Sequence, residues 1–344
     1  MKKFSAPAEI KTGVIGYGGA YNMGRHHLHE MKAAGMTPLA VAEINPDRLN
    51  AARADFPDIE TYATVGEMLA KSAVDLVTVI TPHNTHAALG VQILEAGRHC
   101  VLEKPMALTT TECDTLIATA GKHHAVVSTY HNRHWDGCIL KALDVVNSGA
   151  LGDIVRIDLR AGAHERPQKW WRSSREISGG SLYDWGVHLL EYALQIVRGE
   201  LVEVSAYAWD GFWAAEKNAA HPPGVLNEDE AQLVARFSSG QRVSLTQTSI
   251  DVLPERGMGR IVGTRGTHLI DSSGYETTIM LPTGDRQTTR GKNPPSQGEK
   301  FYQNIAAHLV TGEPLVITPE WARRPIQILD LAMQSTRQKR AISV

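Results

Sequence analysis

The sequence predicts an α/β domain with a parallel sheet at the N-terminus, followed by an α+β domain with a large, mostly antiparallel open sheet. With 344 residues, the chain is long for one hydrophobic core and suits two domains. In residues 1–128, short β-rich runs alternate with helical patterns, as in βαβ units. In residues 129–344, strand-like runs follow one another with few helices between them. We therefore place the domain boundary near residue 128.

In the first domain, strands and helices are expected to alternate. Strands are predicted at Lys11–Ile15, Pro38–Ala42, Val74–Ile80, His99–Leu102 and Ala125–Thr129. Helices are predicted at Met23–Ala34, from Asn45 onward, at Thr85–Ala96 and at Thr110–Lys122. Asn45 is the expected N-cap of its helix, because Pro46 and Asp47 follow it.

In the second domain, alternating strand patterns dominate. They are predicted at Ile154–Ala161, Val202–Ala208, Ala231–Phe237, Arg242–Ser249 and Gly259–Ile270. Ser238-Ser239-Gly240 indicates a hairpin, and Trp213–Glu228 reads as a long polar loop. A final amphipathic helix is expected over residues 321–339, where it can pack back on the first domain.

The overall charge and the cysteine pattern exclude several classes of partner. The formal net charge is −2 without a basic stripe, so no nucleic-acid binding is expected. No run of about 18 apolar residues occurs, and no signal peptide precedes the first strand, so no membrane span is expected. The 3 cysteines show no CxxC spacing, which favours reduced thiols in a cytoplasmic protein.

A glycine-rich turn follows the first predicted strand. Gly16 and Gly18 match the first two positions of G-x-G-x-x-G, where the backbone approaches a pyrophosphate. Tyr21 occupies the third position and does not fit, and a short insertion that moves the role to Gly24 would restore the pattern. The next helix would aim its N–H groups at the phosphates. The expected cofactor contacts in this turn are Gly16, Gly18, Gly19, Ala20 and Met23.

Glu43 ends the second predicted strand. A carboxylate there can accept hydrogen bonds from both ribose hydroxyls of a dinucleotide. No basic residue follows until Arg48, so a 2′-phosphate would meet negative charge. NAD is therefore favoured over NADP, although a solvated strand end would also explain Glu43.

Two segments carry candidates for proton chemistry. Glu103-Lys104-Pro105 puts a lysine at the carboxyl end of a parallel strand, where open α/β sheets bind ligands; a surface ion pair is the alternative. In the second segment, Asp184 and His188 are i,i+4 neighbours if the segment is helical. A carboxylate beside an imidazole raises its basicity, so His188 could take a hydroxyl proton. A structural histidine is the alternative.

In this order, the motifs resemble the glucose-fructose oxidoreductase / inositol dehydrogenase / rhizopine-catabolism (Gfo/Idh/MocA) family of NAD(P)-dependent oxidoreductases. The segment from Thr81 to Gly97 is also similar to that family. The resemblance implies a Rossmann domain and a second domain whose open sheet forms a homodimer or homotetramer. It implies that Lys104 and His188 flank the substrate carbon, with Asp184 in the site. The further cofactor contacts it implies are Thr81, Pro82, Asn84, His86, Glu103 and Lys104.

Aromatic and polar residues near these motifs are candidates for substrate binding. Aromatic faces can stack on sugar C–H surfaces, while Asn and Arg donors can bind hydroxyls. The candidates are Tyr130, Asn132, Arg133, Trp135, Trp171, Arg172 and Tyr183, with Lys104, Asp184 and His188. Core packing is the alternative for the tryptophans, and Arg133 or Arg172 could instead hold a carboxylate or phosphate. His26, His29 and Glu30 share a helix face without a second cluster, so no metal is expected.

The favoured function is NAD-dependent hydride transfer to or from a secondary alcohol carbon of a sugar, sugar derivative or inositol. A glycosidase that retains NAD, and acts by transient oxidation and elimination, could use the same residues. A non-catalytic NAD-binding sensor is the third reading, and the presence of both Lys104 and His188 counts against it.

Overall fold

A computed structural model of the chain describes residues 3–214 and 225–344. It separates into two compact units, Met1–Asn132 with Glu299–Arg323, and Arg133–Gly298 with Arg324–Val344. The expected division at residue 128 differs from this one, because residues 299–323 return to the first unit. Most of the loop predicted at Trp213–Glu228 lies outside the described residues.

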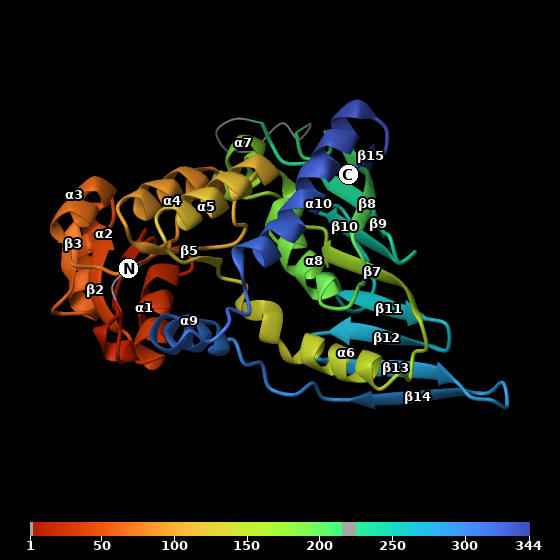
Figure 1. Ribbon diagram of the computed structural model, residues 1–344. Coiled ribbons are helices and arrows are strands. Elements are labelled where there is room, and N and C mark those ends of the chain that lie inside the picture. Colours follow the sequence, from red (N-terminus) through yellow and green to blue (C-terminus); the bar gives the residue numbers. More distant parts are fainter. Residues whose placement is uncertain (1–2, 215–224) are drawn as a thin grey trace. The chain divides into compact units, whose positions relative to one another are not determined.

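The first unit is built on a parallel sheet (Figure 1). Its strand order is β3-β2-β1-β4-β5-β6, and every neighbouring pair is parallel. This is the order of a Rossmann fold, so the predicted α/β class is confirmed. The strands are β1 (Lys11–Ile15), β2 (Thr37–Ala42), β3 (Glu60–Tyr62), β4 (Leu76–Val79), β5 (His99–Leu102) and β6 (Val127–Thr129).

Helices connect these strands and begin where the sequence provides caps. The Asn45 side chain accepts the N–H of Asp47, and Thr109 with Glu112 forms a capping box. The helices are α1 (Met23–Ala33), α2 (Pro46–Asp55), α3 (Val65–Lys71), α4 (His86–Glu95) and α5 (Thr110–Lys122). A later helix, α9 (Lys300–Thr311), packs against α1 in the same unit.

The second unit is built on a mostly antiparallel sheet. Its order is β14-β13-β12-β11-β7-β10-β9-β8-β15, in which the pair of β7 and β10 is parallel. The strands are β7 (Ile154–Gly162), β8 (Leu201–Trp209), β9 (Glu230–Phe237), β10 (Arg242–Thr248), β11 (Gly259–Gly263), β12 (Gly266–Asp271), β13 (Gly274–Met280), β14 (Arg286–Gly291) and β15 (Ile342–Ser343). The predicted strand Gly259–Ile270 is wrong as one element, because a tight turn divides it into β11 and β12.

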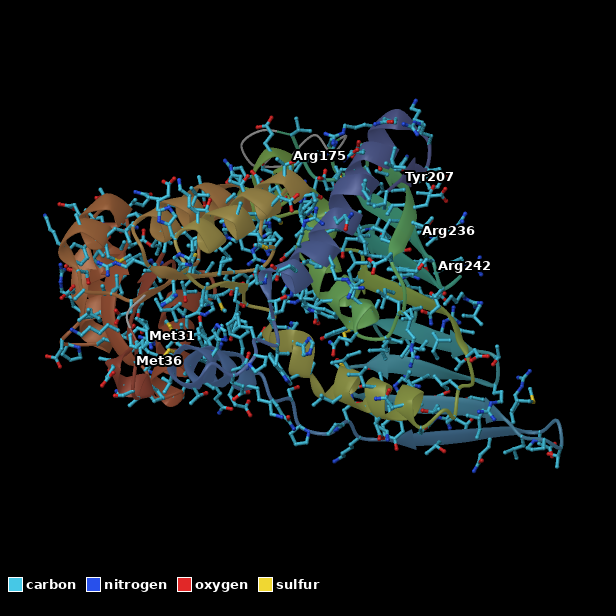
Figure 2. All side chains as sticks on the ribbon, in the orientation of Figure 1. Met31, Met36, Arg175, Tyr207, Arg236 and Arg242 are labelled. Carbon is cyan, nitrogen blue, oxygen red and sulfur yellow. The ribbon has the colours of Figure 1, made fainter. Side chains whose placement is uncertain are left out.

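Helices cover one face of this second sheet. They are α6 (Gly137–Asn147) on β12 and β13, and α8 (Gly186–Leu194) on β7 and β10. Ser335, in the later part of α10 (Pro319–Gln338), accepts the N–H of Ala206 in β8. Tyr207, Arg236 and Arg242 extend from neighbouring strands and are exposed (Figure 2). Self-association through this sheet stays a prediction.

None of the helices within residues 3–214 and 225–344 is long and apolar enough to cross a membrane.

Candidate functional site

The glycine turn between β1 and α1 is shaped for close backbone approach. Gly16 has a left-handed φ of +98°, and a Cβ there would lie 2.5 Å from the carbonyl oxygen of Ile80. Around Gly18, no described residue has a heavy atom within 4 Å of an added Cβ, so the turn is open there. A pyrophosphate needs this combination of a tight turn and an open backbone face.

Gly24 provides the close helix packing for which Tyr21 is unsuited. A Cβ on Gly24, in the first turn of α1, would lie 2.7 Å from both the carbonyl oxygen of Gly16 and Cδ2 of Tyr17. Tyr21 is 58% exposed and precedes the helix. The insertion in the turn therefore moves the third glycine position to Gly24.

The N-terminus of α1 keeps its first N–H groups available. Asn22 precedes the helix with φ 50° and ψ 34°, and its side chain makes no capping hydrogen bond to the described backbone. Free N–H groups at a helix N-terminus attract phosphate. Together with the open glycine turn, this arrangement fits a dinucleotide pyrophosphate. Gly19, Ala20 and Met23 belong to the same turn, and their cofactor contacts stay predictions.

Glu43 follows β2, and its carboxylate closes on the glycine turn. Its Oε2 accepts the N–H of Tyr17 at 2.6 Å, and its Oε1 accepts the N–H of Asn45 at 3.0 Å. The remaining lone pairs can accept ribose hydroxyls. Arg48 in α2 brings a cation to the same place, since a Cβ on Gly19 would collide with its guanidinium. The Glu43 carboxylate and the Arg48 guanidinium thus both lie beside the glycine turn.

The turn after β5 presents an ionised carboxylate beside Lys104. Burial raises the pKa of the Glu103 carboxyl, but the hydrogen bond from His27 and the charges of His27 and Lys104 outweigh it and lower the pKa to about 2. The backbone N–H of Lys104 donates to Glu103 Oε2 at 3.0 Å. The Lys104–Pro105 peptide is cis.

His86 braces this turn from within the unit. Its Nδ1 lies 2.8 Å from the carbonyl oxygen of Pro105, and its Nε2 lies 2.9 Å from that of Thr81. The residue is fully buried, and burial lowers its pKa. His86 thus lies between the backbone segments of Thr81 and Pro105, and its contact with a cofactor stays a prediction. Thr81, Pro82 and Asn84 remain partly or fully exposed, and their contacts stay predictions.

A buried array of hydrogen bonds lies behind Glu103. His27 in α1 places Nε2 3.0 Å from Glu103 Oε1 and Nδ1 2.7 Å from the hydroxyl of Tyr302 in α9. The Tyr302 hydroxyl lies 3.0 Å from that of Thr78 in β4. His27, Tyr302 and Thr78 are each 0% exposed. These side chains come from three elements far apart in the sequence.

The Tyr130 side chain is buried inside the first unit, where its hydroxyl contacts two side chains of α1. It is 2% exposed, and its hydroxyl donates to Glu30 and lies 3.1 Å from His26 Nε2. Its ring lies 4.3 Å from the ring of His27, so it packs beside the buried array. Its hydroxyl is engaged inside the unit, and its contact with substrate stays a prediction.

Asp184 and His188, in the second unit, lie on either side of a helix start, and their joint role stays a prediction. Helix α8 begins at Gly186, so His188 lies in its first turn while Asp184 precedes it. Gly179 and Gly180, with φ of +92° and +118°, precede a short 3₁₀ helix (Ser181–Tyr183) that comes before α8. Asp184 and Trp185 have right-handed helical φ and ψ values in the turn that leads into α8.

The Asp184 carboxylate is held by Arg172. Nη1 of Arg172 donates to the two carboxylate oxygens at 2.7 and 2.9 Å. The same guanidinium lies 5.4 Å from the Trp170 ring and 5.1 Å from the Trp171 ring. Arg172 therefore positions the aspartate. Its own contact with substrate stays a prediction, as does that of half-buried Trp171.

The other substrate candidates divide between surface and core. Arg133 pairs with Asp136 at 2.9 Å and lies 4.8 Å above the Trp185 ring, which is 40% exposed. Tyr183 and Trp135 are 2% and 8% exposed; for Trp135 this burial agrees with the packing alternative, and the substrate contacts of both stay predictions. Asn132 is half-buried, and its role stays a prediction.

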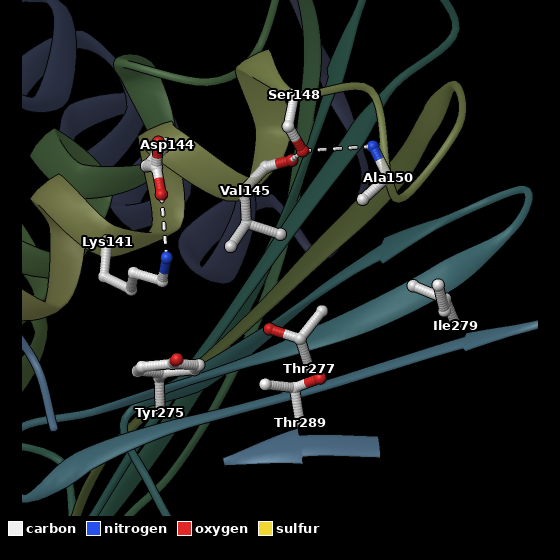
Figure 3. A pocket seen from close by; sticks show the side chains of 9 residues that line it. All are labelled: Lys141, Asp144, Val145, Ser148, Ala150, Tyr275, Thr277, Ile279 and Thr289. Atoms are coloured by element: carbon white, nitrogen blue, oxygen red, sulfur yellow. Dashed lines mark hydrogen bonds and ion pairs between the residues drawn. The ribbon is translucent and has the colours of Figure 1, made fainter. Parts of the chain in front are cut away.

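A cavity of about 220 Å³ lies in the second unit, between α6 and strands β13 and β14 (Figure 3). Lys141 pairs with Asp144 at 2.7 Å and lies 5.0 Å from the Tyr275 ring. The described lining contains none of the predicted site residues. We assign it no role in the chemistry below.

Comparison with known families decides the identity of the two units. The description "Oxidoreductase family, NAD-binding Rossmann fold" matches residues 10–131, and "GFO/IDH/MocA C-terminal domain" matches residues 139–268. The chain belongs to the Gfo/Idh/MocA family. The resemblance found in the sequence motifs is thereby confirmed, and the protein is an oxidoreductase of that family.

Gfo/Idh/MocA relatives match almost the whole chain. The scyllo-inositol 2-dehydrogenase (NADP(+)) IolW of Bacillus subtilis is 27% identical over 351 residues, 97% of this chain and 95% of the relative. The myo-inositol 2-dehydrogenase of Thermotoga maritima is 25% identical over 350 residues, 97% and 98% of the two chains. A levoglucosan dehydrogenase solved with NADH and levoglucosan has a TM-score of 0.82 at 19% identity, covering 97% and 99%. The last match supports the fold alone.

Three residues with clear structural roles escaped the sequence analysis. His27 and Tyr302 were given no role, and Arg48 served only to mark where the first basic residue follows Glu43. Tyr302 lies 275 positions from its partner His27, so no local pattern links them. Arg48 offered a signal, because it is the first basic residue after Glu43.

Proposed function

We propose that the protein is an NAD-dependent dehydrogenase that oxidises a secondary alcohol of a sugar, sugar derivative or inositol. The observation that carries the proposal is the glycine turn, open at Gly18 and closed by the Glu43 carboxylate. The inositol dehydrogenases among the relatives support the substrate class. The two alternatives, a glycosidase that retains NAD and a non-catalytic sensor, gain no support from the relatives.

The residues around the glycine turn would bind the cofactor by its phosphates and adenosine ribose. The first N–H groups of α1 would hold the pyrophosphate, and Glu43 would accept the ribose hydroxyls. The negative charge of Glu43 would repel the 2′-phosphate of NADP and so favours NAD. The positive charge of Arg48 would offset part of that repulsion. When bound, NAD supplies the acceptor for a hydride.

Lys104, His188 and Asp184 would handle the substrate oxygen and its proton. His188 would remove the hydroxyl proton while the hydride leaves the same carbon, and solvent would then take the proton. Lys104 would stabilise the oxygen as negative charge develops on it. Asp184, anchored by Arg172, would fix the hydroxyl or the imidazole in place. The alcohol becomes a ketone.

The test is NADH formation from NAD⁺ with myo-inositol, scyllo-inositol, levoglucosan and glucose as probes. Lys104→Met and His188→Asn should each lower the turnover number by about 10²–10⁴-fold, the usual contribution of such groups. The matched control is Lys71→Met, which removes a surface lysine paired with Glu67 at 3.1 Å and should turn over normally. Full activity in the Lys104 and His188 variants would refute the assignment.

A further inference from the structure

Both oxygens of the Glu103 carboxylate are occupied. Oε1 lies 3.0 Å from His27 Nε2, and Oε2 accepts the backbone N–H of Lys104 at 3.0 Å. A carboxylate can only accept hydrogen bonds, so Nε2 of His27 carries a proton whether the imidazole is neutral or charged. Glu103 is thus fixed on one side by α1 and on the other by the residue that follows it in the chain.

His27 is itself held at its other nitrogen. The Tyr302 hydroxyl, 2.7 Å from Nδ1, can donate to the neutral ring or accept from the charged one. For the neutral ring, one set of donors satisfies the whole array: Thr78 donates to Tyr302, Tyr302 to His27, and His27 to Glu103. Because all three donors are fully buried, breaking any bond would leave a polar atom without water. In either state of the ring, the His27 Nε2–H donates to Glu103, so the contact that fixes the carboxylate is the same.

Helix α1 links this array to the glycine turn. Gly24 and His27 are three residues apart on the helix, so they lie on the same face. Gly24 packs against the backbone of Gly16, while His27 reaches Glu103. One helix face thus contacts both the predicted phosphate cradle and the turn that carries Lys104.

We propose that His27 and Tyr302 are positioning residues for Lys104, acting through the Glu103 carboxylate. They hold that carboxylate in one orientation, and the carboxylate holds the backbone N–H from which the Lys104 side chain extends. Tyr302 comes from α9, so the return of residues 299–323 to the first unit completes the support of the lysine. The inference rests on the proposed function in one respect, the role of Lys104 in hydride transfer.

The first test is independent of any substrate. In the full-length protein with lysine labelled at ¹³Cε, the two Hε protons of a held side chain have separate shifts, whereas those of a mobile one merge. Lys104→Met identifies the resonance. The wild type should show separate Lys104 Hε shifts, and Tyr302→Phe should merge them. Thr78→Val, which removes only the last hydroxyl of the array, should reduce the separation.

Tyr17→Phe is the matched control for Tyr302→Phe. Tyr17 is another buried phenol of the first unit, 5% exposed, and it donates to Asp55 at 2.8 Å instead of to the Glu103 array. This variant should leave the Lys104 shifts as in the wild type. Faster exchange of the His27 Nε2 proton in Tyr302→Phe and Thr78→Val would show that these variants loosen the array. If the two Lys104 Hε shifts nevertheless stay separate, the array does not position Lys104 and the proposal is wrong.

The second test asks whether the effect on turnover passes through Lys104. We expect Tyr302→Phe to lower the turnover number about tenfold in the wild type, as the loss of one buried hydrogen bond implies. In the Lys104→Met background it should have less than about a twofold effect. Equal effects in both backgrounds would show a merely structural role. If Lys104→Met itself is fully active, the proposed function fails, whereas the shifts still decide whether the array holds the lysine.

Discussion

Replacing Gly24 with alanine should weaken NADH binding, because the added methyl group pushes α1 away from the glycine turn. The new Cβ would lie 2.7 Å from the Gly16 carbonyl oxygen, and ordinary contact begins at 3.4 Å. Helix α1 and the glycine turn must therefore move apart by about 0.7 Å, which displaces N–H groups aimed at the pyrophosphate. Losing one charge-assisted hydrogen bond costs about 1.5–3 kcal/mol, so the Kd for NADH should rise roughly 10- to 100-fold.

NADH fluorescence titration measures this change, and Gly121→Ala is its matched control. Gly121 lies inside α5, where no described residue has a heavy atom within 4 Å of an added Cβ. That variant should gain about 0.5–1 kcal/mol of unfolding free energy from helix propensity and bind NADH normally. If Gly24→Ala also binds NADH with wild-type affinity, Gly24 does not serve as the third glycine of the turn.

Three further predictions follow from named contacts. Glu43→Gln removes the charge beside the ribose and should improve NADPH binding relative to NADH about tenfold, measured by fluorescence titration; an unchanged preference would contradict the role of that charge. Burial lowers the pKa of His99 to about 4 from an ordinary 6.5, so its contribution to stability is complete above pH 6.5 and is lost as the pH falls toward 4. His99 should contribute about 3 kcal/mol to the drop in the free energy of unfolding in urea over that range, beside a similar contribution from buried His268. His99→Asn, which keeps an acceptor for the Val126 N–H, should remove the His99 share, and an unchanged pH slope would contradict this assignment. Arg172→Met releases the Asp184 carboxylate and should lower kcat/KM about 10- to 100-fold without changing NADH affinity, so a loss of NADH binding would refute the positioning role.

Where capping and hydrophobic signals are strong, the sequence predicted the elements closely. Lys11–Ile15, His99–Leu102 and Thr110–Lys122 have the same bounds in the structure, because buried runs and the Thr109 cap delimit them. Strand β14 has exposed side chains throughout, so it shows no alternation to detect. Helix α9 was missed although Phe301, Tyr302, Ile305 and Ala306 repeat with helical spacing.

For the site, the sequence identified the local motifs but not their long-range partners. The glycine turn and Glu43 lie together as expected. The turn follows β1 and Glu43 follows β2, and these two strands are parallel neighbours in the sheet. The spacing of Asp184 and His188 suggested one helix, whereas the structure has a short 3₁₀ helix (Ser181–Tyr183) and a turn before α8 begins at Gly186. The tie between His27 and Tyr302 depends on residues 299–323 returning to the first unit, and no local sequence pattern contains that information.

The most direct test of the central claim follows the hydrogen itself. The protein would be incubated with NAD⁺ and inositol deuterated at its ring carbons, and the NADH formed would be analysed by mass spectrometry. We predict one deuterium in each NADH and one ketone for each NADH. Turnover of the deuterated inositol without deuterium in the NADH would contradict the account.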